Sequence, residues 1–301
     1  MSISPAPPPP DDPSTETPST PPPMSRRSFP PAPSPGDRES AAQALFIAVR
    51  EEGENELSRP LGSLWWSGIA AGIAMATSII GRGVLELYLP DEPWEPLVAS
   101  FGYSFGFIVV VMGHMQLFTE NTITTVLPTL ERRDLDCLQR TARLWTIVFL
   151  ANVIGAIGVS GLSVAGIVDG DLLQAMISVA HHGTHPRGLS AFPFAIPAGF
   201  LVAAVVWLTR LAGGQQLPII VALTWLIAVG GFVHVVAGAV ELFLLVWAEG
   251  AHHLGLLWSF LVPAFLGNVV GGTLLFALLA YAQVKAEIEE NGDEAPAAPL
   301  H

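Results

Sequence analysis

Two long apolar segments, each interrupted by polar residues, constrain this chain more than any other feature of its sequence. About 20 apolar residues cross the hydrocarbon core of a bilayer as one α-helix. Residues 97–130 and 217–248 both exceed that length, and each has polar residues near its middle. Backbone groups without helical partners are tolerated at membrane depth only where they are packed in protein or line a wet cavity. The two segments therefore predict membrane helices that break near the midplane.

Four further segments have the length of single crossings, at residues 61–85, 144–168, 191–212 and 256–284. Hydrophobic residues make up 51% of the chain and charged residues only 13%, whereas a soluble domain has about 25% charged residues. We therefore expect an all-α membrane protein with six transmembrane helices, the second and fifth of them broken. The net charge of −13 argues against a nucleic-acid partner, which needs a basic surface.

The ends of the chain differ from this apolar core. Residues 1–40 are rich in Pro, Ser, Thr and acidic residues, a composition that predicts a disordered tail. We expect an interfacial helix at 41–60, a six-span transport domain at 61–285 and a flexible C-terminal tail at 286–301.

Basic residues predict the orientation of the helices. If the N-terminus is cytoplasmic, six crossings return the C-terminus to the same side, and only Arg82 and Arg187 of the 13 Lys and Arg residues fall on the far side. That distribution follows the positive-inside rule. It predicts a multi-pass protein of the inner (plasma) membrane with both termini in the cytoplasm.

An internal repeat organises the six segments. The third contains Asn152-Val153-Ile154-Gly155 and the sixth contains Asn268-Val269-Val270-Gly271. Thr119 precedes the first asparagine by 33 residues, and His234 precedes the second by 34. Three crossings per half place the halves in opposite orientations, so the sequence predicts inverted repeats at about 61–168 and 191–285. Transporters built in this way have their site near the midplane, at the broken helices.

The first break, at residues 113–122, contains the hydroxyl group of Thr119. Glu120, Asn121 and Thr122 after it have the character of the first turn of a resumed helix. The alternative is a loop between two short helices outside the core. His114 precedes these residues, and we leave open whether it lines the pore or serves the structure.

The second break, at residues 230–238, contains His234. Ionisable residues inside a membrane are costly and mark functional sites, and histidine exchanges a proton near neutral pH. The alternative is a histidine of the core whose hydrogen bonds are satisfied. Glu241 lies two turns farther along the same helical face, where it either orients neighbouring helices or stays buried as a neutral acid.

Further histidines lie outside the breaks, at His181, His182 and His185 and at His252-His253. A metal site needs ligands that converge in space, and we assign both groups to loops on the far side of the membrane. The prediction is no metal site, no cofactor and no catalytic residues.

Leu117-Phe118-Thr119, Gly231-Phe232-x-His234 and the two asparagines, at these spacings, resemble the formate/nitrite transporter family. The resemblance covers residues 41–285 and implies a homopentamer with an aquaporin-like fold and one pore per subunit. It implies a channel, not an enzyme, in the lipid membrane, for small monovalent weak-acid anions such as formate, nitrite or hydrosulfide. It also implies that Thr119 and His234 are the polar residues of the pore. The apolar constrictions would comprise Leu117, Phe118, Tyr103, Phe107, Val202 and Ile227.

Three positions depart from the family pattern. The formate channels have a glutamate where this chain has Val233, a lysine within the stretch His182-Gly183-Thr184, and an asparagine where this chain has Gly199. Two rival functions therefore stay open besides anion transport. One is an aquaporin-like channel for neutral solutes, although no Asn-Pro dipeptide occurs in the chain; the other is a membrane scaffold without transport activity. A third alternative is a membrane-embedded metalloenzyme that uses the histidine clusters, which would need its ligands at one depth in the membrane.

Overall fold

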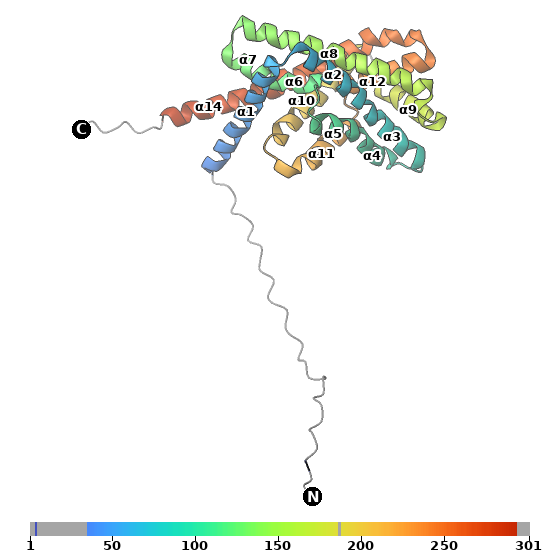
Figure 1. Ribbon diagram of the computed structural model, residues 1–301, viewed down its shortest axis with the longest axis horizontal. Coiled ribbons are helices and arrows are strands. Elements are labelled where there is room, and N and C mark those ends of the chain that lie inside the picture. The colour runs from blue at the N-terminus through green and yellow to red at the C-terminus, as the bar shows by residue number, and fades with distance from the viewer. Residues whose placement is uncertain (1–3, 5–34, 186–187, 294–301) are drawn as a thin grey trace, which may run out of the picture.

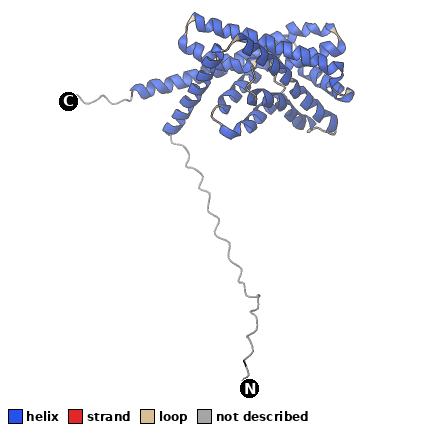
Figure 2. Cartoon of the chain, viewed as in Figure 1, coloured by secondary structure: helices blue, strands red, loops and turns tan. Residues whose placement is uncertain are grey.

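The computed structural model describes residues 4, 35–185 and 188–293, and the predicted N-terminal tail lies almost entirely outside them. The described residues form helices joined by short connections, and no strand occurs among them (Figure 2). This arrangement confirms the predicted all-α fold.

The first repeat contains three crossings, and the second of them is broken as predicted. Its elements are α2 (Leu61–Ala74) and α3 (Ala76–Tyr88), then α4 (Glu95–Ala99) and α5 (Ser104–Met112), then α6 (Phe118–Thr124) and α7 (Val126–Arg132) after the break, and finally α8 (Leu135–Leu162). The resumed helix α6 contains Glu120, Asn121 and Thr122 in its first turns, as the sequence predicts.

The second repeat has the same order. It consists of α10 (Ala191–Thr209), α11 (Gln216–Val229), α12 (Val235–Glu249) after the second break, α13 (Val262–Val269) and α14 (Leu278–Asp293). Five stretches of the described chain are long and apolar enough to cross a membrane, and the shorter apolar helix at residues 213–229 supplies the sixth segment. The last of the five runs from Ala251 to Glu287 and includes two π-helical segments, at Leu257–Leu261 and Val270–Ala277.

Helix α1 (Pro35–Ser58) precedes the first crossing and begins before the expected residue 41. Helix α14 likewise continues beyond residue 285. The two terminal helices lie on the same side of the helical body, both at the left of Figure 1, and they touch through Phe46 and Tyr281, whose ring centroids are 6.1 Å apart. An even number of crossings therefore separates the ends, as predicted.

Helix α9 (Gly170–Gly183) was not predicted, because we assigned this region to a loop. Asp169 caps its start by accepting a hydrogen bond from the Asp171 backbone N–H at 3.0 Å. The helix packs against α3 and α12. His181 and His182 lie in its last turn, so the assignment of these two residues to a loop was wrong.

Glycines allow helices within each repeat to pack closely. Gly68 and Gly72 of α2 contact α8 at Ala151 and Asn152, and Gly267 and Gly271 contact α10 in the second half. These small-residue contacts therefore position the third and sixth crossings, and with them the two asparagines, against the first and fourth crossings.

Candidate pore site

The two breaks have the same backbone geometry. Helix α5 ends where the Gly113 N–H donates to the Val109 carbonyl, and α11 ends where the Gly230 N–H donates to the Leu226 carbonyl, both at 3.0 Å. The next residue has a left-handed backbone in each case, with φ of 48° at His114 and 64° at Gly231. Glycine adopts this conformation without steric cost, whereas His114 holds it under strain.

Asn152 closes the first break. Its side-chain oxygen accepts a hydrogen bond from the Phe118 N–H at 2.9 Å, and its amide nitrogen donates to the carbonyls of Gln116 and Gly68, both at 2.8 Å. Backbone groups freed by a helix break need such partners away from water. One fully buried side chain therefore satisfies both edges of the break and ties it to α2.

Asn268 does the same in the second half. It accepts from the Val235 N–H at 2.8 Å and donates to the carbonyls of Val233 at 2.9 Å and Ala195 at 2.8 Å. Val235 is the first residue of α12, as Phe118 is of α6. The two asparagines, predicted only as markers of the repeat, thus hold the broken helices in matching positions.

Thr119 and His234 meet between the breaks. The Thr119 Oγ1 lies 2.7 Å from the His234 Nε2, and both residues are buried. The other ring nitrogen, Nδ1, accepts a hydrogen bond from the Ala237 N–H at 3.3 Å. A neutral imidazole carries one proton, so we place it on Nε2, which then donates to the threonine hydroxyl.

The apolar residues predicted for the constrictions are buried, and one of them contacts this pair. Phe107 packs edge-on against the His234 ring at a centroid distance of 4.9 Å, and Tyr103 follows at 5.4 Å from Phe107. Leu117, Val202 and Ile227 are almost completely buried. The structure thus brings Phe107 directly onto the pair, with Tyr103 next to Phe107.

The ring of Phe118 packs against other aromatic rings and not against the imidazole of His234. Its ring stacks on Phe265 at 4.7 Å and meets Phe149 and Trp145 edge-on at 5.2 and 5.7 Å. These rings belong to α13 and α8, so Phe118 joins an aromatic cluster that anchors α6 to two neighbouring crossings.

A cavity of about 450 Å³ opens on the side of α9. We call it the α9-side cavity. It reaches His234, and its lining includes Tyr103 and Glu241 together with the only guanidinium among its described lining residues, that of Arg82. Arg82 pairs with Glu86 at 2.8 Å. Glu241 is 7% exposed and contacts Gly183, which places a carboxyl group beside the approach to His234.

A smaller cavity of about 50 Å³ lies on the side of α1, and we call it the α1-side cavity. Leu117 and Glu120 line it, and the Glu120 Oε1 has no hydrogen-bond partner among the described residues. His114 also lines this cavity, which adds a pore-facing position to its backbone role. His234 thus lines the α9-side cavity, and Glu120, the residue after Thr119, lines the α1-side cavity.

Helix α1 covers the α1-side cavity. Its Glu56 accepts a hydrogen bond from the Gln116 side chain at 2.7 Å, and Glu52 pairs with Arg210 at the end of α10. Burial raises the pKa of the Glu52 carboxyl above its usual range, and the Arg210 charge opposes that rise.

The comparison with known families agrees with this geometry. The profile described as "Formate/nitrite transporter" matches residues 43–282, nearly all of the described chain. The chain belongs to the formate/nitrite transporter family. Membership places it among membrane channels and transporters.

Individual members of the family are moderately similar to this chain. The inner membrane protein YfdC of Escherichia coli is 36% identical over 83% of this chain and 81% of its own length. The formate channel FocA of Haemophilus influenzae is 26% identical over 69% of this chain and 82% of its own length.

Solved structures share the fold at lower identity. A "Pentameric formate channel with formate bound" superposes with a TM-score of 0.62 at 21% identity, covering 82% of this chain and 99% of that one. An "FNT family ion channel" gives 0.64 at 22% identity, covering 81% and 97%.

One of the three departures from the family pattern has a visible packing reason. A side chain at Gly199 would collide with the backbone of Asn268, so an asparagine is incompatible with this position as it is packed here. A side chain at Gly183 would meet only the carboxylate end of Glu241, which can turn away. For Val233, the backbone N–H donates to the Phe194 carbonyl at 3.0 Å; nothing in the structure explains why the side chain is apolar.

Sequence reasoning missed several residues of the site, among them Gln116, Arg82 and Arg210. A signal existed for the arginines, because each lies next to or inside a long apolar segment. A basic side chain in such a place marks a wet cavity or an ion pair.

Proposed function

We propose that this protein is a channel for small monovalent weak-acid anions such as formate, nitrite or hydrosulfide. The proposal rests on the hydrogen bond between Thr119 Oγ1 and His234 Nε2, at 2.7 Å, against the Phe107 ring and at the α9-side cavity, with Glu120 next to Thr119 lining the α1-side cavity. A neutral-solute channel would not require an exchangeable proton at this point. Histidine supplies one near neutral pH.

The geometry of the pair supports a role in anion recognition. With Nε2–H donating to Thr119, the hydroxyl proton of the threonine is not needed for the pair and is free to turn toward an anion. Helices α6 and α12 begin beside it, at Phe118 and Val235. Helix N-termini favour negative charge, so an anion at this position meets a hydroxyl donor and two favourable dipoles.

Neutralisation lowers the cost of crossing the apolar region. A bare anion in a low-dielectric interior is strongly disfavoured, whereas the neutral acid is not. A weak-acid anion enters together with one proton from the water of the cavity. His234 takes up this proton and transfers one to the anion, so that the imidazole returns to its neutral form and the acid passes Phe107, Leu117 and Ile227 as a neutral molecule. An anion of a strong acid has no such route.

Arg82 supports the attraction of anions into the α9-side cavity. Its guanidinium is always charged, and it lies in the lining of the cavity that leads to His234. We propose that it serves in place of the lysine that the resemblance places within His182-Gly183-Thr184. Relatives named as formate channels support the substrate class, and the pentameric solved structure supports a homopentamer.

Anion flux in proteoliposomes tests this function. Nitrite and nitrate are close in size and charge, but only nitrite is the anion of a weak acid. We expect nitrite and formate to pass, nitrate and chloride to be excluded at least about tenfold, and His234→Ala to lower nitrite flux at least about tenfold and to flatten its pH dependence.

The control is His252→Ala, because His252 is an exposed histidine outside both breaks. A chelator in the buffer removes any effect of bound metal from the comparison. It should leave flux unchanged. Equal passage of nitrate and nitrite, or a His234→Ala protein with full and equally pH-dependent flux, would refute the proposal.

A further inference from the structure

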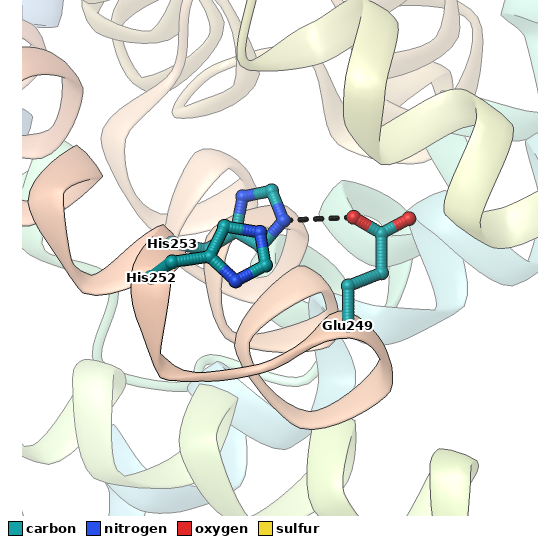
Figure 3. Close-up of side chains that lie close together, drawn as sticks. All are labelled: Glu249, His252 and His253. Atoms are coloured by element: carbon teal, nitrogen blue, oxygen red, sulfur yellow. Dashed lines mark hydrogen bonds and ion pairs between the residues drawn. The ribbon is translucent and has the colours of Figure 1, made fainter.

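A group of histidines lies outside the pore, where α12 ends. Helix α12 stops at Glu249, and Gly250 has a backbone φ of 120°, a conformation that favours glycine. The short 3-10 helix η5 (Ala251–Gly255) then folds back and returns His252 and His253 to the carboxylate of Glu249. The sequence Glu-Gly-Ala-His-His thus forms a compact turn with three side chains on one side (Figure 3).

The carboxylate of Glu249 contacts two imidazoles. Its Oε2 lies 2.7 Å from the His253 Nε2, and its Oε1 lies 2.8 Å from the Nε2 of His181 on α9. The hydrogen bond from His181 lowers the pKa of the Glu249 carboxyl, and the one from His253 adds to this. The ring of His252 lies on that of His253, with centroids 4.1 Å apart.

These side chains have the spacing and chemistry of a metal site. One ligand atom from each of Glu249, His252 and His253 can be chosen so that all three lie within 4.8 Å of one another. A tetrahedral Zn²⁺ with bonds of about 2.0–2.2 Å needs its ligand atoms somewhat closer than this. The three residues are at least partly exposed, so small rotamer changes are sufficient to bring them to that separation.

We propose that Glu249, His252 and His253 bind a late first-row divalent cation, Zn²⁺ in the first instance, with His181 positioned to complete the coordination from α9. Two imidazoles and one carboxylate form a donor set that zinc sites use, and imidazole favours the later transition metals over Mg²⁺ or Ca²⁺. The sequence alone predicted no metal here, because it assigned His181 and the His252-His253 pair to separate loops.

The cation would strengthen the link between α9 and the end of α12, which packing and the His181–Glu249 hydrogen bond already join. His181 belongs to α9, whereas the other three residues belong to the end of α12 and to η5. The neighbouring residues His182 and Gly183 line the α9-side cavity. The site is therefore beside the opening of that cavity, and it is separate from the Thr119–His234 pair.

Metal binding by the full chain, purified in detergent with a histidine-free affinity tag and stripped with chelator, tests this site. Titration with ZnCl₂ should give one ion per chain. Glu249→Gln and the double substitution His252→Ala/His253→Ala should each weaken binding at least about tenfold, a loss that even outer-shell partners can cause. His185→Ala, the matched control from the same histidine-rich stretch as His181, should bind as the wild type does.

Thermal unfolding separates metal binding from folding defects. Without metal, the variants and the wild type should elute alike in size-exclusion chromatography; with Zn²⁺, only the wild type and His185→Ala should gain in Tm, because a ligand that binds the native state stabilises it. No saturable Zn²⁺ binding, undiminished binding in both cluster variants, or an equal loss in His185→Ala would overturn the proposal. None of these readouts depends on anion transport.

Discussion

Thr119 and His234 come from different repeats. The symmetry that relates the two repeats does not produce a second hydrogen-bonded pair of this kind. His234 is the residue before α12, and the residue before α6 is Leu117. The inverted halves therefore place an apolar side chain at one break and an imidazole at the other. The pore is symmetric in its backbone and asymmetric in its chemistry, because an imidazole precedes the resumed helix in only one of the two halves.

Removal of the Thr119 hydroxyl should disable the pair without changing its shape. In Thr119→Val the His234 Nε2–H loses its acceptor, and a buried donor without a partner costs about 1–3 kcal/mol. A free-energy difference of about 1.4 kcal/mol changes an equilibrium constant tenfold. We therefore expect nitrite flux in proteoliposomes to fall about tenfold or more.

Thr119→Ser keeps the hydroxyl and should retain flux within about threefold of the wild type, given the factor of two to three by which such contributions vary. If the serine and valine proteins transport equally well, the hydroxyl has no role in permeation. Both proteins should be monodisperse in detergent before their flux is compared.

At the scale of the helices, the asparagines and the glycines that face them fix the two breaks. Gly72 packs against the backbone of Asn152, and Gly199 packs against that of Asn268. Each glycine belongs to the first crossing of its repeat, so the same contact recurs in the two halves. The close approach lets one asparagine bond to the first crossing and to the break at once.

Even one methyl group at these glycines should therefore disturb the breaks. In Gly72→Ala and Gly199→Ala the new Cβ meets the Asn152 or Asn268 backbone, and overpacking of this kind costs about 1–3 kcal/mol or more. We expect both proteins to lose Tm in detergent and to fall in yield from the membrane. Fluorescence-detected size-exclusion chromatography after heating measures both effects.

Gly158→Ala is the matched control, because Gly158 lies within α8 and no atom lies within 4 Å of an added Cβ. Alanine is the better helix former by about 1 kcal/mol, so this protein should be as stable as the wild type or more so. Equal Tm values for all three alanine proteins would show that the crossing contacts tolerate an additional methyl group.

Sequence reasoning succeeded where a single physical cost dominates. A polar residue in the middle of an apolar segment is costly unless the helix breaks there, and this cost made the two breaks, Thr119 and His234 predictable. It failed for α9, which is too short and too polar to resemble a crossing. It also did not foresee the ring partners of Phe118, because Phe149 and Phe265 come from segments far away in the chain.

For the molecule as a whole, the terminal helices form one layer at one end of the pore. Helix α1 docks there through Phe46 and Val49, which are 8% and 0% exposed. Exposed ion pairs contribute little to stability, so these apolar contacts account for most of the docking. The ion pairs Arg132–Glu54 and Arg50–Glu131 join α1 to the last turn of α7. We call residues 131–143, which continue from there into α8, the arginine-rich loop.

The placement of α1, α14 and the arginine-rich loop on one side allows a single experiment to determine the orientation of the protein. Positive charge near the ends of membrane helices is retained in the cytoplasm. Arg132 and Arg133 lie at the end of α7, and Arg140 and Arg143 lie in the first turns of α8. We therefore expect green fluorescent protein fused after residue 301 to fluoresce. We expect alkaline phosphatase, whose disulfides form only outside the cytoplasm, to be active when inserted at residue 92, between α3 and α4.

The reciprocal fusions, phosphatase after residue 301 and fluorescent protein at residue 92, should both be silent and serve as the matched controls. Replacement of the four arginines by glutamine should reduce the fluorescent fraction if these charges set the orientation. The opposite pattern in the parent fusions would place α1 and the α1-side cavity outside the cell. The Arg82 side of the pore would then face the cytoplasm, and anions leaving the cell would meet its guanidinium before they reach His234.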